Sequence, residues 1–163
     1  MLILIGMGSL RVYIDTSVFG GCFDREFSGD SWAFFEALWA GQITAMLSAT
    51  LLRESEEAPE QDKELVRRAL QGNCERIEVT ADMVDLRDAY LAAQIVTPRY
   101  GDDALHVAQA TIAHADVIVS WNFKHLVNPL RIRGFNQVNT KQGYGEIVIL
   151  TPADIVRMLE SGL

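Results

Sequence analysis

Four side chains that could supply oxygen ligands stand far apart in the sequence, at Asp15, Glu54, Asp103 and Asn122. Three carboxylates gathered in one pocket repel each other unless a proton or a cation lies among them. Oxygen ligands without cysteine favour Mg²⁺ or Mn²⁺ over zinc. Such an ion lowers the pKa of a bound water and neutralises charge that develops on a phosphate. The chemistry that these residue types indicate is therefore hydrolysis of a phosphodiester bond.

Two of these residues follow runs that are predicted as buried strands. Residues 11–15 form a strand that ends in Asp15, and residues 117–120 form an interior strand followed closely by Asn122. Short apolar runs bounded by polar residues suit a parallel sheet that is covered on both faces. In an open α/β sheet the ligand site lies outside the carboxyl ends of the strands. We therefore expect Asp15 and Asn122 at one edge of such a sheet.

Asp103 is predicted in the first turn of a helix, with Asp102 as the helix N-cap. Residues of one helical face recur after Asp103 at i+3, i+4 and i+7, and this face includes His106 and Ala110. His106 is the histidine that this spacing places nearest to the site. The alternative, a buried histidine with a purely structural role, stays open.

Glu54 is predicted on the inward face of a helix that begins after the N-cap Ser48 and ends before Pro59. The neighbouring Glu56 and Glu57 point to water in the same prediction. The alternative is that all three glutamates form a charge cluster on a solvated helix. If Glu54 faces inward, both Glu54 and Asp103 reach the sheet edge from early turns of their helices.

The remaining pattern alternates strands with helices. Strands are predicted at residues 43–47, 77–79 and 146–150, and helices at residues 31–40, 60–70, 81–93 and from Pro152 onward. Residues 128–145, rich in Asn, Gly and Arg, are predicted as a long irregular loop with a functional role. The alternation predicts an α/β fold, a three-layer α/β/α sandwich with a mostly parallel central sheet.

The length of 163 residues suits one domain, predicted at residues 11–163 after an N-terminal extension at residues 1–10. The extension contains GMGSLR, but a dinucleotide loop needs a third glycine and a following helix. It is interpreted as an extra strand, a frayed end or a start-codon artefact. Cys22 and Cys74 have no metal-type spacing and are interpreted as idle thiols. Without a bilayer-length apolar run or a signal peptide, the chain is predicted to be cytoplasmic and to avoid membranes.

Acidic residues are absent from one stretch of the chain. The net charge of −8 argues at first against a nucleic-acid partner, but residues 117–145 contain no Asp or Glu. The stretch combines basic and aromatic side chains: Lys124, Arg131, Arg133 and Lys141 with Trp121, Phe123, Phe135 and Tyr144. Such a strip can hold a phosphate backbone and stack single-stranded bases. The alternative is a solvated loop whose aromatic side chains fill the core.

Short motifs surround the four candidate residues: VYIDTS contains Asp15, LLRESEEAP contains Glu54, DDALHVAQA contains Asp103, and VIVSWNFKHL contains Asn122. In order and spacing these motifs resemble the PIN-domain nucleases, including the VapC-type toxins. The resemblance covers nearly all of the chain from Arg11 onward. It implies a metal-dependent endoribonuclease, and the carboxylates together with the acid-free basic stretch favour single-stranded RNA as its substrate.

Carried over by position, the resemblance implies that Asp15 and Asp103 are the principal ligands of Mg²⁺ or Mn²⁺. Glu54 would bind the metal directly or through water. Asp103 is preferred to Asp102 because its position before Ala104 matches the aspartate of the family.

Asn122 stands where many members of the family have aspartate. An amide coordinates a metal without bringing charge, so a second metal would bind more weakly here. Thr16 and Ser17 match small hydroxyl residues that would bind a phosphate or a water held by the metal. The basic residues expected to bind RNA are Lys124, Arg131 and Arg133.

The resemblance also implies partners. A VapC-type toxin would be blocked by a basic residue of a small antitoxin, and the family commonly forms homodimers. The predicted helical stripe of Trp32, Phe35 and Trp39 offers apolar area for a dimer, although core packing explains the stripe equally well.

Two other functions stay open. A non-catalytic PIN-like module would bind RNA or protein through the same groove, and Asn122 motivates this alternative. A phosphohydrolase that uses Asp15 as nucleophile would need a second aspartate soon afterwards, and residues 16–19 contain none.

Overall fold

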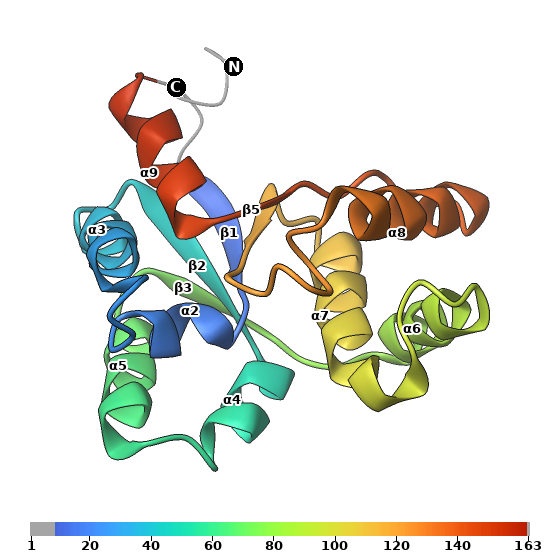
Figure 1. Ribbon diagram of the computed structural model, residues 1–163, viewed down its shortest axis with the longest axis horizontal. Helices are drawn as coiled ribbons and strands as arrows, with labels where there is room; N and C mark the ends of the chain where they lie inside the picture. The colour runs from blue at the N-terminus through green and yellow to red at the C-terminus, as the bar shows by residue number, and fades with distance from the viewer. Residues whose placement is uncertain (1–8, 163) are drawn as a thin grey trace.

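The computed structural model describes residues 9–162, and these fold around a central sheet (Figure 1). The described strands form one parallel sheet in the order β3-β2-β1-β4-β5. They are β1 (Leu10–Ile14), β2 (Ile43–Ser48), β3 (Cys74–Ile77), β4 (Val117–Val119) and β5 (Ile149–Leu150). Strands that alternate with helices along the chain pair in parallel, as the sequence predicted.

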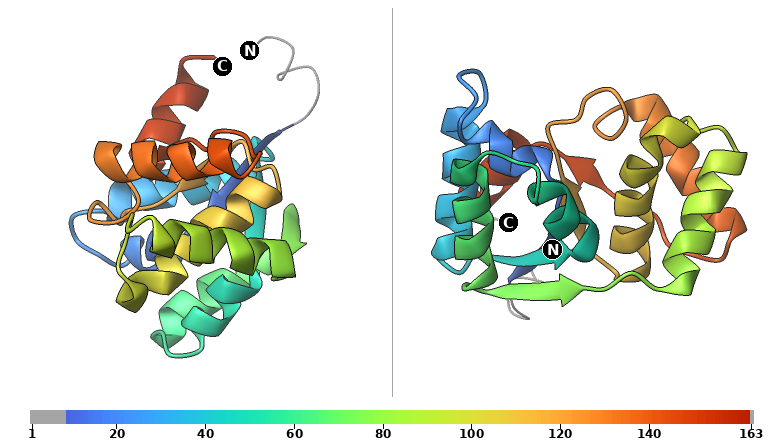
Figure 2. Two further views of the ribbon diagram at one scale, coloured as in Figure 1. Left: turned by 90° about the vertical axis from the view of Figure 1, so that its right-hand side faces the viewer. Right: turned by 90° about the horizontal axis from the view of Figure 1, so that it is seen from below.

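Helices cover both faces of the sheet (Figures 1 and 2). On the left in Figure 1 lie α2 (Ser17–Gly21), α3 (Ser28–Trp39), α5 (Glu60–Leu70) and α9 (Pro152–Glu160). On the right lie α6 (Ala81–Ala92), α7 (Gly101–Ile112), preceded by the short helix η1 (Pro98–Tyr100), and α8 (Pro129–Lys141). Helix α4 (Ala49–Ser55) follows β2 and contacts both α5 and α7. The predicted three-layer α/β/α sandwich is confirmed.

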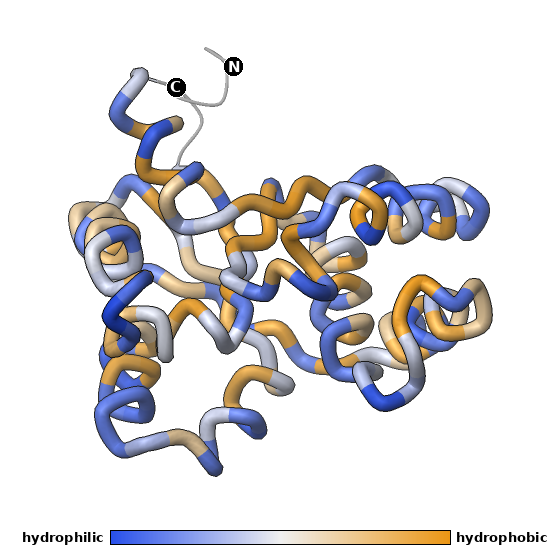
Figure 3. Tube along the Cα trace, in the orientation of Figure 1, coloured by the Kyte–Doolittle hydropathy of each residue, from blue (hydrophilic) through white to orange (hydrophobic). Residues whose placement is uncertain are grey.

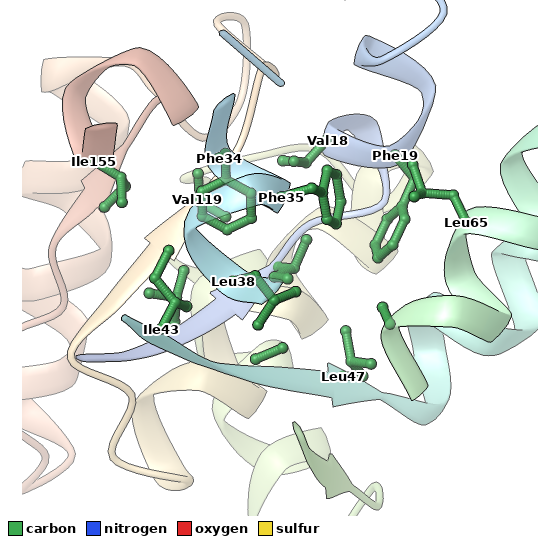
Figure 4. Close-up of a cluster of buried hydrophobic side chains, with 14 of the residues drawn as sticks. Val18, Phe19, Phe34, Phe35, Leu38, Ile43, Leu47, Leu65, Val119 and Ile155 are labelled. Carbon is green, nitrogen blue, oxygen red and sulfur yellow. The ribbon is translucent and has the colours of Figure 1, made fainter. Parts of the chain in front are cut away.

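Alternate residues of each strand pack on opposite faces of the sheet, since successive side chains of a strand point in opposite directions. In β1, Val12 and Ile14 join the core cluster on the α3 side, whereas Tyr13 joins the cluster on the α7 side. Phe34, Phe35 and other apolar side chains fill the first cluster (Figure 4). Hydrophilic residues are most frequent on the outer helices, α5 and α8 among them (Figure 3). The sheet is therefore buried from both sides.

The predicted irregular loop at residues 128–145 is wrong, because most of this segment forms helix α8. Asn128 is its N-cap and accepts hydrogen bonds from the backbone nitrogens of Leu130 and Arg131, at 3.1 and 3.3 Å. Pro129 occupies the first helical position, where a proline costs no hydrogen bond. Phe135 and Val138 bury the inner face. The many Asn, Gly and Arg residues obscured these helix signals in the sequence.

One prediction about local structure near the site also fails, and one glycine there is required by the packing. Gly20 and Gly21 end helix α2. A Cβ atom on Gly21 would lie 2.6 Å from both Ser31 Oγ and Trp121 Nε1, so this position has no room for a side chain. Asp102 is not an N-cap, because α7 begins one residue earlier, at Gly101.

Helix starts at three other places are informative. The predicted N-cap Ser48 is confirmed, and Ser48 and Thr151 each accept a backbone hydrogen bond from the first turn of the helix that follows. Helix α3 begins at Ser28, before the start predicted at residue 31. The region predicted as an N-terminal extension lies largely outside the described residues, and Leu10 already belongs to β1. No helix of the described part has the length and apolar character needed to cross a bilayer.

Candidate active site

The candidate residues gather where the order of the strands reverses. The chain passes from β1 to β2 on one side, while β4 lies on the other side of β1. Ligands of open α/β sheets bind at this switch point, outside the carboxyl ends of the strands. Asp15 directly follows β1, and Ser120 directly follows β4. The backbone nitrogen of Asp15 donates to the carbonyl oxygen of Val119 at 3.0 Å, which joins the two strand ends.

The carboxylate of Asp15 is nearly buried and is held at one of its two oxygens. Oδ2 accepts hydrogen bonds from the hydroxyls of Ser17 and Ser120, at 2.6 and 2.8 Å. Ser17 also accepts a hydrogen bond from the backbone nitrogen of Trp121 at 3.0 Å. The other oxygen, Oδ1, lies 3.6 Å from His106 Nε2, too far for a good hydrogen bond.

Glu54 reaches the site from the last turn of α4, not from an early turn as predicted. Its Oε1 accepts a hydrogen bond from the Thr16 hydroxyl at 2.8 Å and lies 2.6 Å from His106 Nε2. Its side chain is 29% exposed, so the carboxylate lies at the boundary between core and solvent. The prediction that Glu54 is on the inward face is borne out by these contacts, and Glu56 and Glu57 are exposed.

Asp103 lies in the first turn of α7, as predicted. Its Oδ2 lies 2.9 Å from Nδ1 of His125, whose ring packs 4.0 Å, between centroids, from that of Tyr100. Both His125 and Asp103 are largely shielded from solvent. The site therefore contains a second histidine that the sequence analysis did not place there.

The three carboxylates share one arrangement. Each has one oxygen held by side chains of the protein, while the other accepts no hydrogen bond from the described residues. Residues 9–162 contain no group of three acidic, histidine or cysteine side chains already arranged around one ion. The set nevertheless fits Mg²⁺ or Mn²⁺, since Mg²⁺ in enzymes is often held by only one or two carboxylates together with waters and substrate phosphates.

The electrostatics of the site show excess negative charge. Burial and the nearby charge of Asp15 raise the pKa of Asp103, although His125 and His106 oppose this. Burial alone would raise the pKa of Glu54, but the hydrogen bond and charge of His106 outweigh it and lower this pKa. Burial alone would lower the pKa of His106, whereas its hydrogen bond to Glu54 and the nearby carboxylates raise it. A cation among the carboxylates would relieve the repulsion felt by Asp103.

Comparison with known proteins identifies the family and supports the fold. A model of the PIN domain matches residues 11–124. This chain belongs to the PIN-domain family. A crystal structure of VapBC2 from Rickettsia felis, bound to a DNA fragment from their promoter, shares the PIN fold with a TM-score of 0.55. It is 14% identical to this PIN domain in sequence, and the match covers 87% of this chain and 98% of that chain. The comparison with curated proteins gives no match.

Asn122 has a local structural role in this PIN domain. Its side-chain Oδ1 accepts a hydrogen bond from the backbone nitrogen of His125 at 3.0 Å. Its backbone carbonyl accepts hydrogen bonds from Leu126 and Val127, at 3.1 and 2.8 Å. Asn122 thus shapes the turn that presents His125 to Asp103, and the oxygen that would coordinate a metal already has a partner.

Asp102 and His106, the two further candidates, lie in different surroundings. Asp102 points outward and pairs with Arg53 at 2.9 Å, with about half of each side chain exposed. This pair links the surfaces of α7 and α4. His106 is completely buried and lies between Glu54 and Asp15. His106 therefore contacts the site, and Asp102 does not.

The acid-free stretch separates into different regions. Phe135 is fully buried and Tyr144 packs on the core, as the alternative interpretation expected. The guanidinium of Arg131 donates to the carbonyl of Ile95, and Arg133 lines a surface cavity beside α8 that contains none of the three carboxylates. Phe123 and Lys124 directly follow the candidate residue Asn122 in the sequence.

Lys124 lies 5.5 Å from the centre of the Tyr100 ring. Phe123 is 49% exposed and lies beside Trp121, which stacks on Phe27. An exposed aromatic ring next to a lysine is a suitable surface for a base and its phosphate. Within the predicted RNA-binding strip, Lys124 is linked to Asp103 through Tyr100 and His125.

Sequence reasoning missed four residues that are hydrogen-bonded to the candidate ligands directly or through one or two other side chains: Ser120, His125, Tyr13 and Gln109. Ser120 stands at a strand end, and His125 follows Asn122 by three residues, so both carried a positional signal. Tyr13 and Gln109 carried none, because an aromatic in a strand and a glutamine in a helix usually have ordinary packing roles.

Proposed function

We propose that this PIN domain is a metal-dependent endoribonuclease. The observation that carries the proposal is the group of three carboxylates at the sheet switch point, each held at one oxygen by the protein. Fixed donors of this kind orient metal ligands and maintain their charge. A purely structural role explains neither the gathering of repelling carboxylates nor the raised pKa of Asp103.

Mg²⁺ or Mn²⁺ would be held by Asp15 and Asp103, with Glu54 binding directly or through water. When bound, the ion would acidify water and offset charge on the phosphate. Ser17 and Ser120 keep Asp15 in one orientation through its Oδ2. Thr16 and His106 hold Glu54 as a carboxylate through its Oε1.

The proposed substrate is single-stranded RNA. Phe123 would stack on a base, and Lys124 would contact a neighbouring phosphate. Thr16 and Ser17 lie at the phosphate site but already hold Glu54 and Asp15, so their main role is to fix the carboxylates. Arg131 and Arg133 would contact only RNA that extends along α8.

A toxin of a type II toxin–antitoxin pair is the proposed biological setting, acting in the cytoplasm. The solved VapBC2 structure, which shares the fold, motivates this proposal. A small antitoxin would place a basic side chain among the carboxylates. A homodimer is also proposed, but not through the predicted aromatic stripe, because α3 packs against α9 and Phe35 is fully buried. A short reading frame directly upstream, encoding a protein that blocks cleavage, would support the pair.

The test is cleavage of a mixed pool of single-stranded RNA with Mg²⁺, with Mn²⁺ and with EDTA. Wild type should give fragments only with metal, and Asp103→Asn should lose at least about 100-fold in rate, since it removes charge at the reacting centre. Asp102→Asn is the matched control, one residue away on the same helix but paired outward with Arg53. Its rate should match wild type. Full activity of Asp103→Asn would contradict the proposal.

A non-catalytic RNA-binding module is the second candidate, because Asn122 offers neither charge nor an unused side-chain oxygen. This function predicts RNA binding of equal strength with Mg²⁺ and with EDTA. It also predicts no cleavage products from wild type in any condition. The same set of reactions therefore separates the two functions.

A further inference from the structure

A chain of buried polar side chains leads from the core to Glu54. Gln109, Tyr13 and His106 are all completely buried. The Tyr13 hydroxyl lies 3.1 Å from Gln109 Oε1 and 2.6 Å from His106 Nδ1. His106 Nε2 then lies 2.6 Å from Glu54 Oε1. Three side chains from β1 and α7 thus connect in series to one oxygen of a proposed metal ligand.

The unpaired nitrogen of Gln109 indicates the direction of the hydrogen bonds. Gln109 Nε2 is buried and has no partner among the described residues. The oxygen and nitrogen of a glutamine amide are interchangeable in shape, so their assignment follows from the hydrogen-bond network. Turning the amide places the nitrogen where it donates to the Tyr13 hydroxyl. This change gives the buried donor a partner and leaves the amide oxygen without one, and buried N–H groups are left unpaired less often than buried carbonyl oxygens.

With the amide turned, the hydrogen bonds run in one direction. Gln109 donates to Tyr13, Tyr13 donates to Nδ1 of His106, and Nε2–H of His106 donates to Glu54. The Tyr13 hydroxyl donates only to an unprotonated ring nitrogen, so the neutral form of the imidazole carries its hydrogen on Nε2. A ring with its hydrogen on Nδ1 would instead leave Glu54 without this donor.

We propose that Gln109 and Tyr13 are positioning residues that fix the Nε2–H tautomer of His106, which in turn orients Glu54 for metal binding. The inference rests on the proposed function. Thr16 donates to the same Oε1, so Oε1 has two donors and Oε2 is left to face the metal site. Partners of this kind one step removed from a metal ligand typically change metal affinity or activity by about 10-fold to 100-fold.

A second buried tyrosine supplies a matched control. Tyr90 is also completely buried on the α7 side of the sheet, and its hydroxyl donates to Asn139 Oδ1. Asn139 in turn holds Thr111 and the carbonyl of Gly145, so this network ends in the backbone and away from the carboxylates. Tyr90→Phe removes the same atom as Tyr13→Phe from a similar environment.

The experiment measures Mn²⁺ affinity by electron paramagnetic resonance, together with thermal unfolding and RNA cleavage, for wild type, Tyr13→Phe, Gln109→Met and Tyr90→Phe. We expect Tyr13→Phe to weaken Mn²⁺ binding about tenfold, and Gln109→Met to weaken it less. Tyr90→Phe should lose a similar amount of stability yet bind Mn²⁺ as wild type does. Wild-type affinity in both Tyr13→Phe and Gln109→Met would overturn the proposal.

A readout without metal or RNA keeps the proposal separate from the proposed function. At a pH where the imidazole is neutral, ¹⁵N chemical shifts of the His106 ring should show a protonated Nε2 and an unprotonated Nδ1. Tyr13→Phe should shift the tautomer toward Nδ1–H, and Tyr90→Phe should not. A wild-type ring protonated at Nδ1 would refute the proposed role of Gln109 and Tyr13 even if RNA is cleaved. If the ring is protonated at Nε2 but the protein neither binds Mn²⁺ nor cleaves RNA, the role of Gln109 and Tyr13 stands and the proposed nuclease function is refuted.

Discussion

The two faces of the central sheet are built differently, although the same strands supply both. On the α3 side, Val12, Ile14 and Leu47 meet phenylalanines and other apolar side chains. On the α7 side, Tyr13 and Tyr90 introduce hydroxyls into the core, and each hydroxyl belongs to a hydrogen-bonded network. One face therefore stabilises the fold mainly by apolar burial, and the other combines burial with hydrogen-bonded networks inside the core.

This difference shows which hydrogen-bond network of the core reaches the candidate site. Apolar packing has no direction, whereas a hydrogen-bond network holds particular atoms in particular places. The network from Tyr13 ends at Glu54, and the network from Tyr90 ends at the backbone beside α8. On the α7 side, the Tyr13 network can therefore transmit a buried substitution to Glu54. Three substitutions test this comparison.

The largest expected effect on stability lies on the apolar face. Phe34→Ala empties a fully buried position in the centre of that cluster (Figure 4). Such truncations typically cost about 3–5 kcal/mol in the free energy of unfolding. Denaturant unfolding measures the loss, and Leu130→Ala, at a residue that is 79% exposed, is the control, with a change below about 0.5 kcal/mol. The cleavage rate per folded molecule should stay at the wild-type value.

An intermediate loss of stability is expected on the polar face, at a residue away from the candidate site. Asn139→Ala leaves the hydroxyls of Tyr90 and Thr111 without this partner in the core. A buried polar group left unpaired costs about 1–3 kcal/mol, so denaturant unfolding should show a loss in this range. Metal affinity should not change, because this network does not reach the carboxylates. A drop in Mn²⁺ affinity would show that both polar networks, and not one, are coupled to the site.

The smallest effect is a pH dependence at the carboxylates. Burial and Asp15 raise the pKa of Asp103 in the folded protein, so the unfolded chain releases this proton at lower pH. Ionisation of Asp103 therefore removes stability as the pH rises from the ordinary aspartate pKa through the raised one. In EDTA, Asp103→Asn should lack this loss, and its stability relative to wild type should increase over that range.

Thermal unfolding at several pH values measures this difference, and Asp102→Asn is again the control because Asp102 is exposed. Saturating Mg²⁺ should stabilise wild type more than Asp103→Asn, since the ion binds the folded carboxylates. Parallel pH profiles for wild type and Asp103→Asn would show that repulsion at the site is negligible.

Much of the fold followed from local sequence signals. The strand before Asp15, the N-cap Ser48 and the cap and proline at Thr151 and Pro152 each depend on neighbouring residues only, so the sequence was sufficient. Helix α8 was missed because its composition masked a cap and a proline of the same kind. Asp102 was misassigned as a cap because helix ends shift easily by one or two residues, and the N-cap is Tyr100.

For the candidate site, the sequence was sufficient to name the residues whose oxygen atoms could bind a metal. It was also sufficient to predict that a parallel sheet brings Asp15 near Asp103. It did not determine which oxygen of each carboxylate is held, or by which side chain. Those details come from residues distant in the chain, such as Tyr13 and His106, whose contacts exist only when β1 packs against α7. Side-chain hydrogen bonds between distant elements leave no periodic pattern in the sequence. They could therefore be identified only once the folded structure was known.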